Sequence, residues 1–157
     1  MGKFDWFWKA MGSTTERNNK KSKAVVANAH GLIEELSLLD DASLASAVAS
    51  TVRDGAIADK PRFLAGLSVA SQRTLGMTPF EVQNQAVLRL LEGDVIQMAT
   101  GEGKTLVGAM AATGFALQGK RVHLITVNNY LAARDAEWMR PLVEFFGLPG
   151  GRVKEPS

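Results

Sequence analysis

The segment from Thr100 to Thr105, Thr-Gly-Glu-Gly-Lys-Thr, combines residue types that can hold a phosphate chain. Gly101 and Gly103 allow a sharp turn and a close backbone approach to a ligand, because neither carries a Cβ atom. The amide N–H groups of the loop can then converge on phosphate oxygens at the positive end of a helix that starts near Lys104. The ammonium group of Lys104 would reach the β- and γ-phosphates, and the Thr105 hydroxyl would ligate Mg²⁺. The segment therefore predicts a nucleotide-phosphate loop.

The loop departs from the general phosphate-loop pattern at one position. That pattern has a further glycine five residues before Gly103, where this chain has Met98. The alternative interpretation is a glycine-rich turn between a strand and a helix, with Lys104 exposed to solvent. A Gly-Lys-Thr sequence at a helix start directly after an apolar strand is a demanding combination, and it favours the phosphate loop.

Gln83 is a second candidate binding residue, on a helix that precedes the loop. A carboxamide donates one hydrogen bond and accepts another, and this pair matches N7 and N6 of adenine. Taken alone, Gln83 would be interpreted as an exposed helix residue. Its predicted contact with adenine therefore depends on the phosphate loop.

Strands and helices in alternation are predicted to position the loop. The pattern of apolar residues predicts a short strand over 95–98, a helix over 104–117 and a β-branched strand over 122–127. A last helix follows from 128 or 129 to about 146. This order, with tight turns, predicts parallel strand pairing and a right-handed crossover, and hence an α/β fold. The tail 149–157 is rich in Pro and Gly and contains no third strand, so the domain is expected to be cut short.

The region before the loop is predicted to be helical. Asp59 is expected to cap one helix, and Gly76 to end it. Thr78-Pro-Phe-Glu81 resembles a capping box that opens the helix carrying Gln83, with Val82 among the residues on its apolar face. The expected helices span residues 20–39, 42–53, 59–75 and 78–93.

Composition excludes several classes of protein. The chain has 157 residues, 46% of them apolar, with 18 Lys and Arg against 16 Asp and Glu, which is typical of a folded globular domain. The absence of cysteine excludes a disulfide scaffold, a cysteine-ligated zinc site and thiol chemistry. No apolar run is long enough to cross a bilayer, and the N-terminus lacks the pattern of a secretory signal. A cytoplasmic location is expected.

Charge is distributed unevenly along the chain. Residues 1–23 carry six bases and two acids and include Phe4, Trp6, Phe7 and Trp8, whereas residues 24–94 have a net charge of −4. The first segment could form a helix at an anionic membrane surface, or it could pack its aromatic rings on the body of the protein. The chain is thus divided into a basic aromatic segment (1–23), a helical region with Gln83 (24–93), a partial nucleotide-binding domain (94–148) and an irregular tail (149–157).

Three stretches resemble the N-terminal part of SecA, the motor ATPase of bacterial preprotein translocation, and more closely an accessory SecA of the actinobacterial type. They are Leu75–Gln83, Met98–Leu106 and Val122–Met139. Two departures are visible: Asn129 stands where the family usually has Asp, and Pro149-Gly-Gly151 replaces a valine-rich strand. The second departure indicates a truncation or a shifted reading frame.

The resemblance implies a fold and a function. It implies that N-terminal helices precede the first β–P-loop–α–β–α units of a RecA-like P-loop NTPase motor domain, here truncated. It implies that ATP and Mg²⁺ bind, with Gln83 at adenine and the stretch Thr100, Gly101, Glu102, Gly103, Lys104 and Thr105 at the phosphates. Lys104 and Thr105 would take the catalytic roles. Expected partners are the SecYEG channel, preproteins and an anionic membrane surface at the cytoplasmic face, with a homodimer of the full-length family protein and no nucleic acid.

Hydrolysis needs an acid that the sequence does not supply. Phosphoryl transfer requires Mg²⁺ to be held by an acid at the end of a second strand, typically within an Asp-Glu pair, and the chain contains no such pair. We therefore predict that the full-length relative hydrolyses ATP, whereas this chain binds nucleotide weakly and turns it over negligibly. Two rival hypotheses are a fragment of a superfamily-two nucleic-acid helicase and a remnant without catalytic activity.

Overall fold

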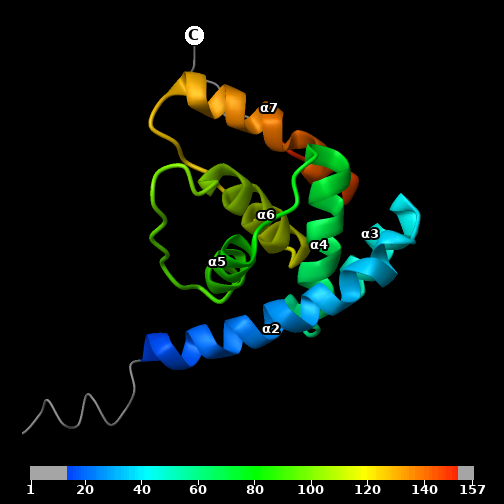
Figure 1. Ribbon diagram of the computed structural model, residues 1–157. Helices are drawn as coiled ribbons and strands as arrows, with labels where there is room; N and C mark the ends of the chain where they lie inside the picture. Colours follow the sequence, from blue (N-terminus) through cyan, green and yellow to red (C-terminus); the bar gives the residue numbers. More distant parts are fainter. Residues whose placement is uncertain (1–13, 152–157) are drawn as a thin grey trace, which may run out of the picture.

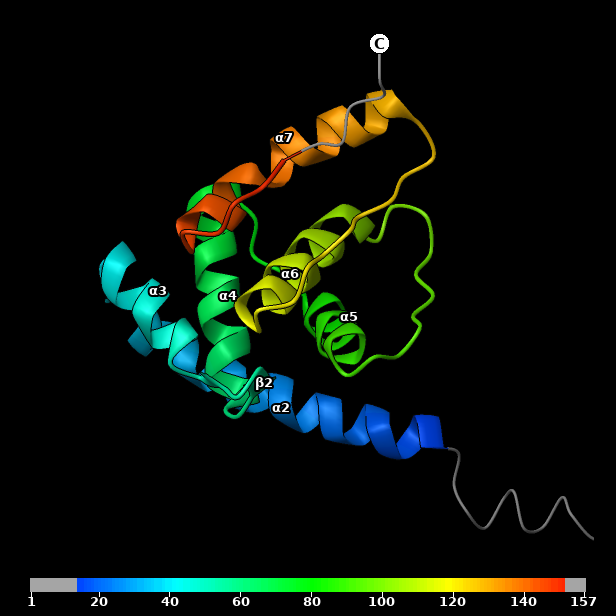
Figure 2. The ribbon, with the colours of Figure 1, turned by 180° about the vertical axis from the view of Figure 1, so that it is seen from behind.

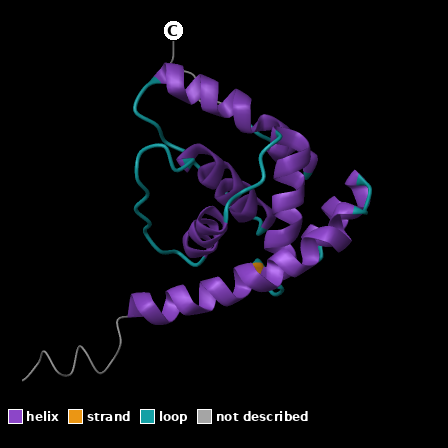
Figure 3. Ribbon diagram, viewed as in Figure 1, coloured by secondary structure: helices purple, strands orange, loops and turns teal. Residues whose placement is uncertain are grey.

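The computed structural model describes residues 14–151, which form six helices and one short hairpin (Figures 1 and 3). The side chains of residues 14–18 and the predicted N-terminal aromatic segment up to residue 13 lie outside the part that is described. None of the helices within residues 14–151 is long and apolar enough to cross a bilayer. In chain order the elements are α2 (Thr14–Ser37), α3 (Asp41–Ala49), β1 (Val52–Arg53), β2 (Ala56–Ile57), α4 (Lys60–Leu75), α5 (Glu81–Leu91), α6 (Lys104–Leu117) and α7 (Asn129–Phe145).

Helix α4 is the centre of the packing. It stands between α2 on one side and α6 and α7 on the other (Figures 1 and 2). Nine consecutive residues of α4, from Phe63 to Ser71, are buried, so that α4 is covered on all sides along this stretch. One continuous apolar core joins it to Leu36 of α2, Met110 of α6 and Leu142 of α7. The N-terminal helices and the loop-bearing helix α6 therefore share a single core.

Most helix ends lie where the sequence predicts them. The Arg62 amide donates to the Asp59 carboxylate over 3.1 Å, and Gly76, with φ of 67°, ends α4. Asn128 caps α7, because its side-chain oxygen accepts the Leu131 amide over 2.9 Å. Each cap satisfies a backbone group that helix geometry leaves without a partner. These local predictions are confirmed.

The predicted end of the helix over 42–53 is wrong. The helix predicted over 42–53 ends at Ala49 and is followed by the hairpin, in which Val52 pairs with Ile57. Its two-residue turn is Asp54-Gly55, both with positive φ, as the type I′ hairpin turn requires. The Asp-Gly pair, with Val52 two residues before it and Ile57 two residues after it, is the sequence pattern that could have identified the hairpin.

The start of α5 also differs from the prediction. The helix begins at Glu81, and the Thr78 hydroxyl donates to the Gln72 side chain over 2.6 Å instead of capping α5. Half of a capping box is present two residues later, because the Phe80 amide donates to Gln83 Oε1 over 2.9 Å. Val82, predicted on the apolar face, is 57% exposed. The buried face of α5 is instead the one that carries Gln83.

The predicted strands 95–98 and 122–127 are not strands, and within residues 14–151 the fold is mainly helical rather than α/β. Both segments are drawn as loop (Figure 3). In the segment 95–98, Ile96 and Met98 pack on the core while Val95 is 98% exposed, as alternate residues of an extended segment do. A pair of parallel strands, however, is stable only inside a larger sheet covered on both faces. The described residues hold no further strands to build one, and so no ladder forms.

Candidate functional site

The predicted phosphate loop forms a left-handed turn directly before α6. Gly101 and Gly103 have φ of 87° and 77°, and α6 begins at Lys104, the position that the sequence predicts. Both angles lie in the region that favours glycine, and this explains the two glycines of the loop. Within residues 14–151, no backbone acceptor takes the amide hydrogens of Gly101, Gly103, Lys104 or Thr105. These amides are therefore available to an anion at the positive end of α6.

The charged side chains of the loop contact the loop itself. The Lys104 ammonium donates to the Ala99 carbonyl over 3.1 Å, and the Glu102 carboxylate accepts the Ala99 amide over 2.6 Å. Lys104 is exposed, and Thr105 is half-buried on the first turn of α6. A nucleotide phosphate could reach Lys104 without opening the core. The predicted loop residues thus lie together on one accessible surface.

Gln83 lies against this loop. Its side chain is only 6% exposed, so the interpretation of Gln83 as an exposed helix residue is wrong. Its Nε2 donates to the Glu102 carbonyl over 2.9 Å, while its Oε1 accepts the Phe80 amide. A Cβ atom at Gly103 would lie 2.3 Å from that Nε2, and hence only glycine permits the contact. The structure brings the two candidates of the sequence analysis together.

The Nε2 and Oε1 atoms of Gln83 can each form one further hydrogen bond. A carboxamide carries two N–H donors and an oxygen with two lone pairs, and the contacts above use one of each. The remaining donor and acceptor can still pair with N7 and N6 of adenine. Gln83 therefore has one donor and one acceptor beyond those that its contacts with Phe80 and Glu102 use.

Two members of this arrangement, Phe80 and Ala99, were not predicted from the sequence. They take part through backbone groups, which carry no residue-specific pattern. For Phe80 a pattern existed, because a Gln at the third helical position commonly bonds back to the residue that precedes the helix. The Ala99 contacts depend on the fold of the loop and had no counterpart in the sequence.

We expect Gln83→Leu to destabilise the ligand-free protein. The change keeps the apolar bulk but removes the acceptor of the Phe80 amide and the donor to Glu102, and each such hydrogen bond contributes about 0.5–1.5 kcal/mol. For a chain of this size the melting temperature should fall by about 2–4 °C for each kcal/mol. Thermal unfolding followed by circular dichroism measures the shift.

Gln85→Leu is the matched control, because Gln85 lies two residues further along α5 and is half-buried. It should leave the melting temperature nearly unchanged. Gln83→Glu separates the two contacts, since it keeps the acceptor for Phe80 but places an oxygen against the Glu102 carbonyl. Equal losses for Gln83→Leu and Gln85→Leu would contradict the assignment.

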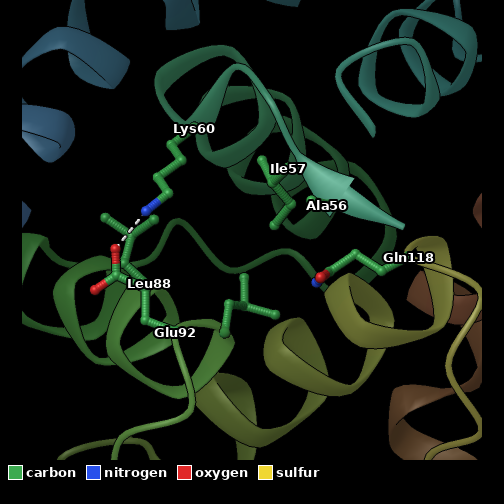
Figure 4. Close-up of a pocket in the computed structure, with 7 residues that line it drawn as sticks. Ala56, Ile57, Lys60, Leu88, Glu92 and Gln118 are labelled. Atoms are coloured by element: carbon green, nitrogen blue, oxygen red, sulfur yellow. Dashed lines mark hydrogen bonds and ion pairs between the residues drawn. The ribbon is translucent and has the colours of Figure 1, made fainter. Parts of the chain in front are cut away.

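A cavity at the other end of α5 is separate from the candidate site. It has a volume of about 180 Å³ and lies between the hairpin and the C-terminal ends of α5 and α6, with the Lys60–Glu92 ion pair at its rim (Figure 4). No group of three or more His, Asp or Glu side chains in the described part could hold a metal ion.

Comparison with known proteins identifies the family. The model of the SecA DEAD-like domain matches residues 7–156. The chain is 62% identical to protein translocase subunit SecA 2 of Corynebacterium efficiens, over 99% of this chain and 20% of the relative. The corresponding proteins of Corynebacterium jeikeium and Mycolicibacterium smegmatis are 55% and 48% identical, over 97% and 96% of this chain.

The chain spans about a fifth of the length of the curated relatives it matches. The resemblance seen in the sequence, to an accessory SecA of the actinobacterial type, is confirmed and is preferred to the superfamily-two helicase hypothesis. The matched region includes both Gln83 and the loop before α6. Since the family model covers nearly every residue, the chain belongs to the SecA family, in the region of its DEAD-like domain.

Proposed function

We propose that this chain is the ATP-binding portion of a SecA-type motor that drives preproteins across the bacterial cytoplasmic membrane. The observation that carries the proposal is the contact between the buried Gln83 side chain and the loop at Gly103. A base-reading amide and a set of free backbone amides at a helix start are the two halves of an adenine nucleotide site. Their contact supports a single ligand that spans both.

Each residue has a defined role in this proposal. The amides of Gly101, Gly103, Lys104 and Thr105 hold the phosphates, with Thr100 and Glu102 shaping the turn. Lys104 neutralises charge on the β- and γ-phosphates, and the Thr105 hydroxyl is a ligand of the Mg²⁺ that accompanies them. Gln83 pairs with adenine. In this division the region 24–93 recognises the base and the region 94–148 holds the phosphates.

The proposed partners follow from the family. The relatives are protein translocase subunits, which supports preproteins and the SecYEG channel as the partners of the complete motor. We place the protein at the cytoplasmic face of the membrane as a peripheral component. The basic aromatic segment 1–23 would contribute to that association, and residues 1–13 of it lie outside the described part.

We predict that the purified chain releases phosphate from ATP at a rate close to the uncatalysed rate. Binding positions the phosphates, but hydrolysis also needs a second-strand acid on Mg²⁺ and an oriented water, and the chain has no Asp-Glu pair to supply that acid. Steady-state phosphate release measures the rate, with a full-length SecA 2 relative as the positive control. Turnover similar to that of the relative would contradict the prediction, whereas failure to bind ATP would contradict the proposed function itself.

A further inference from the structure

Helix α5 is attached to both ends of the connection 94–103, which runs from the end of that helix into the phosphate loop. At the far end, Gln83 Nε2 donates to the Glu102 carbonyl over 2.9 Å. At the near end, the Arg89 guanidinium pairs with the Asp94 carboxylate, and the Asp94 amide donates to the Arg89 carbonyl over 3.0 Å. The proposed function uses the first attachment and gives Arg89 no role.

The Arg89 side chain is largely removed from solvent. It is 14% exposed, the smallest fraction among the ion-paired arginines within residues 14–151. Its Nη1 also donates to Glu92 over 3.2 Å, and Glu92 pairs with Lys60 at the start of α4 (Figure 4). Water and salt screen such a pair less than an exposed one. Arg89 is therefore suited to hold Asp94 in one place.

Asp94 determines which side of the connection faces the body. Asp94, Ile96 and Met98 are half-buried, and the residue that follows each of them is exposed. Ile96 and Met98 pack on the core. Because successive side chains of an extended segment point to opposite sides, a shift by one residue would reverse them all. Fixing Asp94 therefore fixes the direction from which the chain reaches Ala99.

Ala99 is the residue to which the charged side chains of the loop bind. Its carbonyl accepts the Lys104 ammonium over 3.1 Å, and its amide donates to the Glu102 carboxylate over 2.6 Å. A displacement of Ale99 would move these groups relative to the start of α6. Backbone amides bind an anion well only while they point into one concave turn. The position of Ala99 should thus affect how well the loop binds phosphates.

We infer that Arg89 is a positioning residue for the nucleotide, which acts by holding Asp94 at the start of the connection into the phosphate loop. The inference rests on the proposed function and adds to it a residue that touches neither base nor phosphate. Arg89 acts on the phosphate side of the site, whereas Gln83 acts on both sides. Loss of the contact between Arg89 and Asp94 should therefore weaken nucleotide binding without unfolding the protein.

Isothermal titration of ATP with Mg²⁺ tests the inference. Arg89→Met keeps the aliphatic stem and Asp94→Asn keeps the side-chain size, while each removes the ion pair. Each should raise the Kd for ATP by about fivefold, the effect of a pair at the upper end of the range for partly exposed sites. The double variant should bind no more weakly than Arg89→Met alone, because both changes remove one contact. Arg89→Lys, which can still pair with Asp94, should bind nearly as well as the unmodified chain.

Two matched controls carry the same substitutions elsewhere. Arg62→Met removes an ion pair between α4 and α2, and Asp41→Asn removes one between α3 and α4. Both should bind ATP like the unmodified chain. The ligand-free melting temperature of Asp94→Asn should stay nearly unchanged, because Asp94 is half-buried at the surface. Asp94→Asn alone decides the result if Arg89→Met does not fold.

Backbone ¹⁵N relaxation provides a readout that needs no nucleotide. The order parameters of Gly101 and Gly103 should be lower in Asp94→Asn than in the unmodified chain, and unchanged in Arg62→Met. An unchanged Kd in Asp94→Asn, an equal loss of affinity in Arg62→Met, or unchanged order parameters would each overturn the inference. If the unmodified chain does not bind ATP but the order parameters fall as expected, the proposed function is contradicted while the positioning of the loop by Arg89 stands.

Discussion

Lys104→Ala is expected to abolish the rise in melting temperature that ATP and Mg²⁺ produce in the unmodified chain. The Lys104 ammonium lies in the loop, 3.1 Å from the Ala99 carbonyl, and is the one cationic side chain of the stretch 99–105. A ligand that binds only the folded protein stabilises it by RT ln(1 + [L]/Kd), which is about 2.7 kcal/mol at a concentration a hundred times Kd. For a chain of this size that corresponds to about 5–11 °C.

In Lys104→Ala, the ATP-induced rise in melting temperature should disappear because ATP binding is lost, and not because the ligand-free protein is less stable. Lys104 is exposed and contacts only the loop, so the ligand-free melting temperature of Lys104→Ala should equal that of the unmodified chain. Lys21→Ala, an exposed lysine on α2, is the control and should keep the full shift. Differential scanning fluorimetry across an ATP titration measures both. An unchanged shift in Lys104→Ala would remove Lys104 from the proposed site.

Gly66→Leu is expected to destabilise the fold severely. Gly66 lies in the buried stretch of α4, and a Cβ atom there would sit 2.2 Å from Cγ2 of Val48 on α3. Val48 is fully buried and, being β-branched, has few rotamers into which it can move. Overpacking of a core typically lowers the free energy of unfolding by about 1–3 kcal/mol. Because this site has no room for even one methyl group, we expect leucine to lower it by about 3 kcal/mol or more.

Gly31→Leu is the matched control, because Gly31 is also a helical glycine but has no atom within 4 Å of its Cβ position. There the better helix propensity of leucine should stabilise the protein by up to about 1 kcal/mol. The two substitutions therefore have opposite expected signs in chemical denaturation. Similar behaviour of both variants would show that α3 does not pack on α4 through Gly66.

The helices and their ends could be predicted from the sequence because they depend on neighbouring residues. Asp59, Gly76 and Asn128 act on backbone groups within one turn, and the start of α6 follows from Gly103 and Lys104. In the same way the N-cap Asp40 of α3 accepts the Ser43 amide, and that hydrogen bond lowers the pKa of its carboxyl group. Such interactions have the same partners in any fold.

The strands could not be predicted in the same way, because a strand is defined by a partner that lies elsewhere in the chain. The apolar residues of 95–98 predicted a strand, and in the structure Ile96 and Met98 pack on the core without forming one. The pattern of apolar residues could not show whether a neighbouring strand exists to accept their backbone hydrogen bonds. For 122–127, no neighbouring strand is present within residues 14–151, and Ile125 and Val127 are exposed.

By itself, the sequence determined most of the helices and several of their ends, the loop Thr100–Thr105, the candidate role of Gln83 and the family. Only the tertiary structure decided that Gln83 is buried, that its amide bonds to the Glu102 carbonyl, and that Gly103 has no room for a Cβ atom. It also decided that the apolar segments form no sheet. The physical reason is range: caps and turns are contacts between near neighbours, whereas burial, strand pairing and the meeting of α5 with the loop need segments that are distant in the chain to pack together.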